Sequence, residues 1–266
     1  MSLSFGAVNT DRVVLATSTL LDVGNPFTVA GWFYPTTLTS GRILFAKAGG
    51  LYVVDLSGTG GDLRLQWNRA GGSTSFITND TPLANLNQWY FVAGVMDTTA
   101  SAGNVGSIYT GTLTTAVVES TYGTATDGAG GVGTNGLAWA IGNRGAGTQN
   151  LSFEGRIAWA GLWTRALTLA NLRELQYRMM NTVDCQVFMH LGHQGTGTQI
   201  DYSGNKINGT VTGATVAAHV LLSSPWGWDT PPPPKNRFDN PRLLRLQPGF
   251  GRVVRTRSPG LVKARL

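Results

Sequence analysis

The chain has 266 residues, of which 36 are glycine and only 13% are charged, and its formal net charge is +6. This composition favours a sheet protein with many turns and argues against a helical bundle. No apolar run approaches the ~20 residues of a membrane-spanning helix, and the first residues, MSLSFGAV, lack the basic and apolar regions of a secretory signal. The single cysteine, Cys185, excludes an intramolecular disulfide. Synthesis in a reducing cytoplasm is therefore expected.

Charge is distributed unevenly along the chain. Residues 1–234 carry 11 Lys and Arg against 13 Asp and Glu, a net charge of −2. Residues 235–266 carry nine basic residues against Asp239, a net charge of +8. The basic character therefore belongs to the C-terminal end of the chain, behind a mildly acidic body.

From residue 3 to residue 120 the sequence predicts short strands separated by turns. Strand pairs are expected at 3–5 with 13–15, 42–47 with 51–56, 63–68 with 75–78, and 107–112 with 114–120. Two further strands, 27–34 and 88–97, are apolar at successive positions, which indicates burial on both faces. Residues 123–136 are almost all small or polar and predict a surface loop, after which 137–141 resumes the sheet.

The segment 151–177 is expected to organise the whole sandwich. Its first half predicts a strand buried on both faces, with Ile157, Trp159 and Trp163 sharing one of them. Thr168 is a suitable N-cap for a short helix in which apolar residues recur at helical spacing, at Leu169, Leu172, Leu175 and Met179. A strand at 186–191 and a series of turns at 195–211 follow. Short strands at this spacing predict a two-sheet sandwich.

The character of the sequence changes at Trp226. A polyproline run at residues 231–234 favours an extended chain, and the residues beyond it have too few apolar side chains for a core of their own. We therefore predict two parts, a sandwich at 1–222 and a Pro-rich, basic, extended arm at 223–266.

The succession of strands resembles the laminin-G-like, concanavalin A-like jelly roll over about residues 2–222. The matching segments are PFTVAGWFYP (26–35), ILFAKAGG (43–50), NQWYFVAGVMD (87–97), IYTGTL (108–113), AIGNRG (140–145), FEGRIAWAGLWTRALT (153–168) and GTGTQIDYSGNKINGTVTGA (195–214). The resemblance implies an all-β fold of two antiparallel sheets, one of them concave, with glycan binding, adhesion or virion attachment as common roles. Relatives often carry an acidic pair where this chain has Ala158-Trp159, and a Tyr-Val-Asp-Gly-type hairpin where it has Tyr109-Thr110-Gly111. Both departures argue against an acidic or calcium-dependent site.

The residues needed for catalysis or metal binding are mostly missing. Retaining glycosidases need two carboxylates ~5–5.5 Å apart, but Glu119, Glu154 and Glu174 have no acidic residue two positions away. There is no Gly-x-Ser-x-Gly motif for a serine nucleophile. His190 and His193 have only His219 and Cys185 as further zinc ligands, and no acidic cluster suits calcium. We predict a protein that is not an enzyme and has no metal or cofactor.

Three polar residues at strand ends are candidates for ligand binding. Asp97 ends a central strand, and Asn143-Arg144 opens the loop before residue 151. Rim residues of lectin-like sandwiches can hold a sugar, although ordinary solvated turns are the alternative. Asp201, in the sequence DYSGN, is expected to accept hydrogen bonds from the Ser203–Gly204 turn, with ligand contact as its alternative.

The C-terminal arm is the candidate for assembly. The strand pattern places Trp32, Trp89, Trp159 and Trp163 in the core, whereas Trp226 and Trp228 lie past the sandwich and could anchor on a neighbour or on its concave face. The proposed assembly residues are Trp226, Trp228, Arg237, Phe238, Arg242, Arg245, Phe250, Arg252, Arg255 and Arg257. Clustered arginines suit nucleic acid, an acidic protein surface, an anionic membrane or merely solvent. Apolar residues interleaved with them favour protein over nucleic acid, and no amphipathic face supports a membrane.

These features lead to one functional prediction with one alternative. We predict a non-enzymatic virion protein of a bacteriophage, a capsid decoration or a minor capsid or tail component. Its arm would dock on other virion proteins, it would form a homo-oligomer, and its lectin-like sandwich would be displayed. The alternative is a carbohydrate-binding or adhesion module that holds glycans at the concave face or the rim loops.

Overall fold

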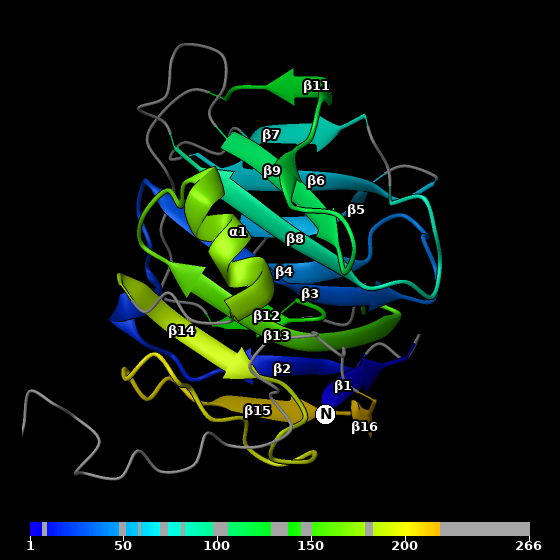
Figure 1. Ribbon diagram of the computed structural model, residues 1–266. Helices are drawn as coiled ribbons and strands as arrows, with labels where there is room; N and C mark the ends of the chain where they lie inside the picture. Colours follow the sequence, from blue (N-terminus) through cyan, green and yellow to red (C-terminus); the bar gives the residue numbers. More distant parts are fainter. Residues whose placement is uncertain are drawn as a thin grey trace, which may run out of the picture. The chain divides into compact units, whose positions relative to one another are not determined.

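Two eight-stranded antiparallel sheets, which we call sheet A and sheet B, make up most of the described part of the chain (Figure 1). The computed structural model describes residues 1–6, 10–47, 52–57, 60–69, 74–80, 83–97, 106–128, 138–144, 151–178 and 183–218. The predicted arm, including Trp226, Trp228 and every proposed assembly arginine, lies outside these residues. The predicted jelly-roll sandwich with one short helix is confirmed.

Sheet A is built around the organising segment. Its strand order is β10 (Val118–Glu119), β9 (Gly106–Thr112), β8 (Tyr90–Met96), β3 (Phe27–Pro35), β13 (Gly155–Trp163), β1 (Ser2–Phe5) and β16 (Thr215–Ala217), and β14 (Cys185–His190) also pairs with β13. The strands β3, β8 and β13 at its centre are those predicted to be buried on both faces, and all of their residues except Tyr34 and Arg156 are buried.

Sheet B contains the remaining strands. Its order is β11 (Tyr122–Thr126), β7 (Thr74–Asn79), β6 (Asp62–Asn68), β5 (Tyr52–Ser57), β4 (Ile43–Lys47), β12 (Trp139–Ile141), β2 (Arg12–Leu15) and β15 (Gly209–Thr212). A 3-10 turn, η1 (Thr19–Leu21), precedes β3. In β6 buried and half-buried residues alternate, as expected for a strand with one face on the core.

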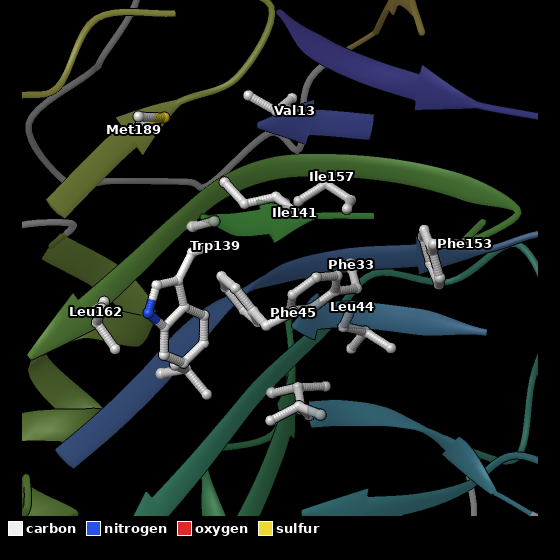
Figure 2. Close-up of a cluster of buried hydrophobic side chains, with 14 of the residues drawn as sticks. Val13, Phe33, Leu44, Phe45, Trp139, Ile141, Phe153, Ile157, Leu162 and Met189 are labelled. Atoms are coloured by element: carbon white, nitrogen blue, oxygen red, sulfur yellow. The ribbon is translucent and has the colours of Figure 1, made fainter. Parts of the chain in front are cut away.

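The space between the sheets is filled by one hydrophobic cluster. Figure 2 shows side chains of both sheets meeting there, with Phe33 and Leu162 from sheet A against Phe45 and Trp139 from sheet B. The Phe33 ring stands edge-on to the Phe45 ring at 5.6 Å between centroids. The indole N–H of Trp139 donates to the carbonyl of Leu21 at 2.8 Å, so even the polar atom of this buried ring is paired.

The helix α1 (Leu169–Arg178) lies on the outer face of sheet A (Figure 1). Leu172 and Leu175 are fully buried against a second apolar cluster that includes Trp32 and Trp159. The predicted N-cap is confirmed, because the Thr168 hydroxyl accepts from the Asn171 N–H and the Asn171 side chain accepts from the Thr168 N–H. Met179 lies outside the described residues. No helix among the described residues has both the length and the apolar character needed to cross a membrane.

Three expectations about the strands are wrong. Residues 3–5 and 13–15 do not pair, because Leu3 pairs with Ile157 in sheet A while Val13 pairs with Ile141 in sheet B. The second wrong expectation is that Ile157 and Trp159 share a face. A bulge in β13 between them turns Ile157 to the inner cluster and Trp159 to the outer one.

The third wrong expectation is the loop at 123–136, whose first residues form β11, an exposed edge strand paired with β7. Residues 129–137 lie outside the described residues.

Candidate carbohydrate-binding face

The three predicted rim residues lie in different sheets. Asp97 directly follows β8 of sheet A, whereas Asn143 and Arg144 follow β12 of sheet B. Asn143 is only 2% exposed, and its amide donates to the Ser152 hydroxyl at 2.7 Å. Its side-chain oxygen accepts from the Arg144 N–H at 2.7 Å. These contacts shape the loop after β12, and a role of the three residues in ligand binding stays a prediction.

Asp201 is the turn-forming residue that the sequence predicts. Its carboxylate accepts hydrogen bonds from the N–H groups of Phe188, Ser203 and Ile207 at 2.8–3.0 Å, and from the Ser203 hydroxyl at 2.8 Å. Asp201 is 7% exposed, so the four donors replace water around a buried carboxylate. The turn interpretation is confirmed.

His190 and Cys185 lie against apolar and aromatic side chains, whereas His193 is exposed. The His190 ring stands edge-on to Phe188 and Tyr202, at 5.2 Å between centroids in each case. Cys185 is buried, and burial raises the pKa of its thiol to about 12, so the reactive thiolate is scarce at neutral pH. Within the described part of the chain no group of three or more His, Cys, Asp or Glu side chains could hold a metal ion.

The outer faces of the two sheets differ in what covers them. On sheet A, α1 seals the cluster around Trp32, Phe91 and Trp159 from water. The described residues contain no other α-helix, and none packs on the outer face of sheet B (Figure 1). Among the described residues, therefore, only the outer face of sheet A has a helical cover.

Alternate residues of neighbouring strands give this part of sheet B a mixed surface, which we call the Phe76 face. It comprises Arg64, Gln66 and Asn68 of β6, Thr74, Phe76 and Thr78 of β7, and Thr124 and Thr126 of β11. The residues between them, such as Leu65 and Ile77, are buried in the core. Each of the eight is half-buried or exposed.

The strand register places polar groups around the Phe76 ring. Phe76 lies opposite Gln66 on one side and Thr126 on the other. One step along β7, Thr78 lies opposite Arg64 and Thr124. Residues opposite one another on a sheet face have Cβ atoms about 4.5–5.5 Å apart. An aromatic ring is thus placed among one amide and three hydroxyl side chains, with Arg64 beside Thr78.

An ion pair between the half-buried Arg64 and the buried Asp55 fixes one corner of the Phe76 face. The Arg64 guanidinium donates to the two carboxylate oxygens of Asp55, from Nε at 3.1 Å and from Nη2 at 2.6 Å. Asp55 is 3% exposed, and burial raises the pKa of its carboxyl, an effect that the hydrogen bonds and charge of Arg64 and the charge of Arg144 oppose. The pair holds the Arg64 guanidinium, whose side chain is 32% exposed, in one orientation.

Sequence reasoning did not single out this face. The alternation in LRLQWN (63–68) does predict Arg64 and Gln66 on the face opposite to Leu63, Leu65 and Trp67. The alternation does not say which sheet the helix covers. A polar sheet face is a candidate binding surface only if no helix lies over it.

Known proteins share the fold. The first similar solved structure is that of a proposed carbohydrate binding protein of Bacteroides ovatus, with 17% identity, 83% of this chain covered and a TM-score of 0.57. This chain spans 61% of that protein. A Limulus polyphemus pentraxin is 17% identical, with 65% of this chain and 80% of that chain covered and a TM-score of 0.47. Domain 4 of a Geobacillus stearothermophilus arabinanase is 19% identical, with 61% and 80% covered and a TM-score of 0.41.

No curated protein matches the sequence significantly. Residues 7–173, more than half of the chain, match the laminin G family described as the concanavalin A-like lectin/glucanases superfamily. The resemblance stated from the strand motifs is thereby confirmed. The chain belongs to the concanavalin A-like lectin/glucanase superfamily.

Proposed function

We propose that the protein binds carbohydrate on the Phe76 face of sheet B. The observation that carries the proposal is the half-buried Phe76 ring, flanked across the strands by Gln66, Thr126 and their neighbours on a sheet face that no described helix covers. Sugar rings present apolar C–H surfaces that pack on aromatic rings, and hydroxyls that need donors and acceptors nearby. The Phe76 face offers both.

The polar groups of this face are available to a ligand. Within the described residues the side chains of Gln66, Thr78 and Thr124 form no hydrogen bond, and the amide of Gln66 supplies both donors and acceptors. Arg64 adds charge-assisted donors that Asp55 holds in place. The three strands of the face, at about 4.8 Å spacing, span about 10 Å, which is room for more than a single contact.

The fold agrees with this proposal without establishing it, because one fold serves many functions. The Bacteroides ovatus protein described as binding carbohydrate shares the fold of this chain. The Phe76 face supports binding better than hydrolysis. Asp55 is an acidic residue beside it but is engaged by Arg64, whereas Glu154 pairs with Arg42. We therefore propose a binding function and no catalysis.

A glycan array probed with the full chain tests the proposal. We expect at least one glycan class to be retained, and Phe76→Ala to weaken its binding about tenfold or more. Tyr177→Ala is the matched control, since Tyr177 is an exposed aromatic residue of α1 on the other sheet, and this variant should bind normally. A blank array with a folded chain, or equal binding by both variants, would contradict the proposal. Unchanged reducing-end content of the retained glycan checks that it is bound and not cleaved.

A second candidate function rests on the charge distribution. The net charge of +8 in residues 235–266 supports docking of the arm on an acidic protein surface, such as a virion. Attachment to a bacteriophage particle stays a proposal. Replacing Arg242, Arg245, Arg252 and Arg255 by Gln should release the protein from such a particle at lower salt, because exposed pairs are screened beyond ~10 Å at 0.1 M. Retention that is equal at every salt concentration would count against charge-based docking.

A further inference from the structure

A groove of about 380 Å³ opens at one end of sheet A, lined by residues that follow β7 in the sequence and by residues that precede β11. One wall is the loop 83–88, which leads into β8, and the other is the turn 112–118 between β9 and β10. Tyr90 and Thr110, from the neighbouring strands β8 and β9, also line it. Its volume lies in the range of small-molecule sites, about 300–1,000 Å³.

The first wall is fixed by a tyrosine. The Tyr90 hydroxyl accepts from the Asn85 N–H at 2.9 Å and donates to the Asn85 carbonyl at 3.2 Å, so both backbone groups of one loop residue are held. The loop is also tied at its two ends. The Leu83 N–H donates to the Gly61 carbonyl, and the Asn87 N–H donates to the Pro35 carbonyl, each at 2.9 Å.

The second wall is fixed by a glutamine of the helix. Gln176 is fully buried and reaches from α1 into the turn after β9. Its Nε2 donates to the carbonyls of Thr112 and Thr115, and its Oε1 accepts from the Val117 N–H, all at 2.7 Å. The approach is so close that a Cβ on Gly111 would lie 2.7 Å from Gln176 Nε2. Both walls are therefore set before any ligand arrives, which lowers the entropy cost of binding.

The lining is mostly apolar, includes the side-chain amides of Asn85 and Gln88 and the hydroxyl of Thr110, and carries no acidic or basic side chain. The Asn85 amide nitrogen donates to the Gln88 side-chain oxygen at 3.2 Å, which leaves the Asn85 oxygen and the Gln88 nitrogen as a paired acceptor and donor. The Thr110 hydroxyl makes no hydrogen bond within the described residues. Leu83 and the exposed Val118 supply apolar surface beside these groups.

We propose that this groove is a second binding site, for a neutral saccharide, an inference that rests on the carbohydrate-binding function proposed above. A charged ligand would lose hydration in the groove and find no countercharge there. A lipid tail would leave the amides and the threonine hydroxyls without partners. A neutral sugar needs no countercharge and leaves no polar group unpaired. Its hydroxyls can pair with Asn85, Gln88 and Thr110, while its C–H groups contact Leu83 and Val118.

Titration of the isotope-labelled full chain, followed by two-dimensional ¹H–¹⁵N NMR, tests the site. The probes are the methyl glycosides of glucose, galactose, mannose and N-acetylglucosamine. We expect at least one of them to shift the amide signals of Asn85, Thr110 and Thr112. Thr110→Val, which removes a hydroxyl at nearly constant volume, and Gln88→Ala should each weaken this binding about threefold to tenfold. Since Gln88 lies in the loop before β8, its variant keeps the test decisive if Thr110→Val does not fold.

The Phe76→Ala variant separates the two proposals. If the groove signals still shift in this variant, the groove is a site of its own, as proposed. If a glycoside shifts only signals of the Phe76 face, the groove proposal is overturned and the proposed function stands. If only the groove responds, carbohydrate binding on sheet B is overturned instead. Groove shifts that are equal in the native chain, Thr110→Val and Gln88→Ala would also overturn the groove proposal, since the affinity would not come from its lining.

Discussion

The outer faces of sheets A and B share one architecture but differ in chemistry. On sheet A, strands β3, β8 and β13 turn Trp32, Phe91 and Trp159 outward, and α1 covers them (Figure 1). On sheet B, strands β6 and β7 turn Gln66, Phe76 and Thr78 outward, and no described helix lies over them. A strand that is apolar on both faces requires a cover, whereas an alternating strand leaves one face for water or a ligand. The difference gives one outer face a role in stability and leaves the other as the face proposed for binding.

The largest expected effect comes from opening the covered face. Trp159→Ala removes a fully buried ring that contacts Phe91 and Phe188 at 5.9 Å and 5.1 Å between centroids. We expect the free energy of unfolding to fall by about 3–5 kcal/mol, as measured by guanidinium denaturation. Phe76→Ala, on the open face, should cost markedly less, because its ring is only half-buried. Equal losses in the two variants would show that α1 does not seal sheet A.

An intermediate effect is expected from the polar contact between the helix and sheet A. Gln176→Met keeps the volume but removes three hydrogen bonds and leaves the Val117 N–H without its partner. The expected loss of stability is about 1–3 kcal/mol. Gln186→Met is the matched control, because the half-buried Gln186 makes one side-chain hydrogen bond, to Thr164. A loss no greater than that of the control would mean that Gln176 does not anchor the turn.

A smaller, pH-dependent effect is expected beside the open face. Burial raises the pKa of Asp55 above its ordinary value of 3.8, so the folded state binds this proton more tightly than the unfolded state does. The stability of the native chain relative to Asp55→Asn should therefore rise as the pH falls from neutral through the folded-state pKa, and level off below 3.8. The change is at most about 1.4 kcal/mol per unit of raised pKa. Urea denaturation of both proteins across this range measures it, and a relative stability that falls on acidification would contradict the raised pKa.

Most of the sandwich could be predicted from the sequence, because its strands carry their own periodicity. The alternation in β6, the doubly apolar β3 and β13, and the Thr168 cap are all local signals. The pairing of strands was harder to predict. Leu3 and Val13 are close in sequence but pair with Ile157 and Ile141, since pairing is decided by distant segments. The edge strand β11 was missed because its side chains show no buried pattern. It is defined only by its backbone pairing with β7.

The candidate site was harder to predict for a related reason. Asn143 has the chemistry of a ligand-binding residue, but the fold buries it against Ser152, which a single sequence does not reveal. Phe76 looks like an ordinary strand residue, and only the sheet order and the position of α1 leave it on an uncovered face. Polarity can be read from the sequence, whereas access depends on tertiary structure.

The smallest disturbance of the fold is expected from thiol labelling, which measures how readily a reagent reaches the outer face of each sheet. Cys185 lies in the cluster beneath α1, where burial raises the pKa of its thiol to about 12. It should resist alkylation at about pH 8 in the native chain and react after unfolding, because the thiolate is the nucleophile. A cysteine placed on the open face by Thr124→Cys should react at the rate of a free thiol, since Thr124 is exposed. Slow labelling at position 124 would show that another part of the chain covers the Phe76 face. Fast labelling at Cys185 would show that α1 opens readily, and in that case the two outer faces would differ less in access than in composition.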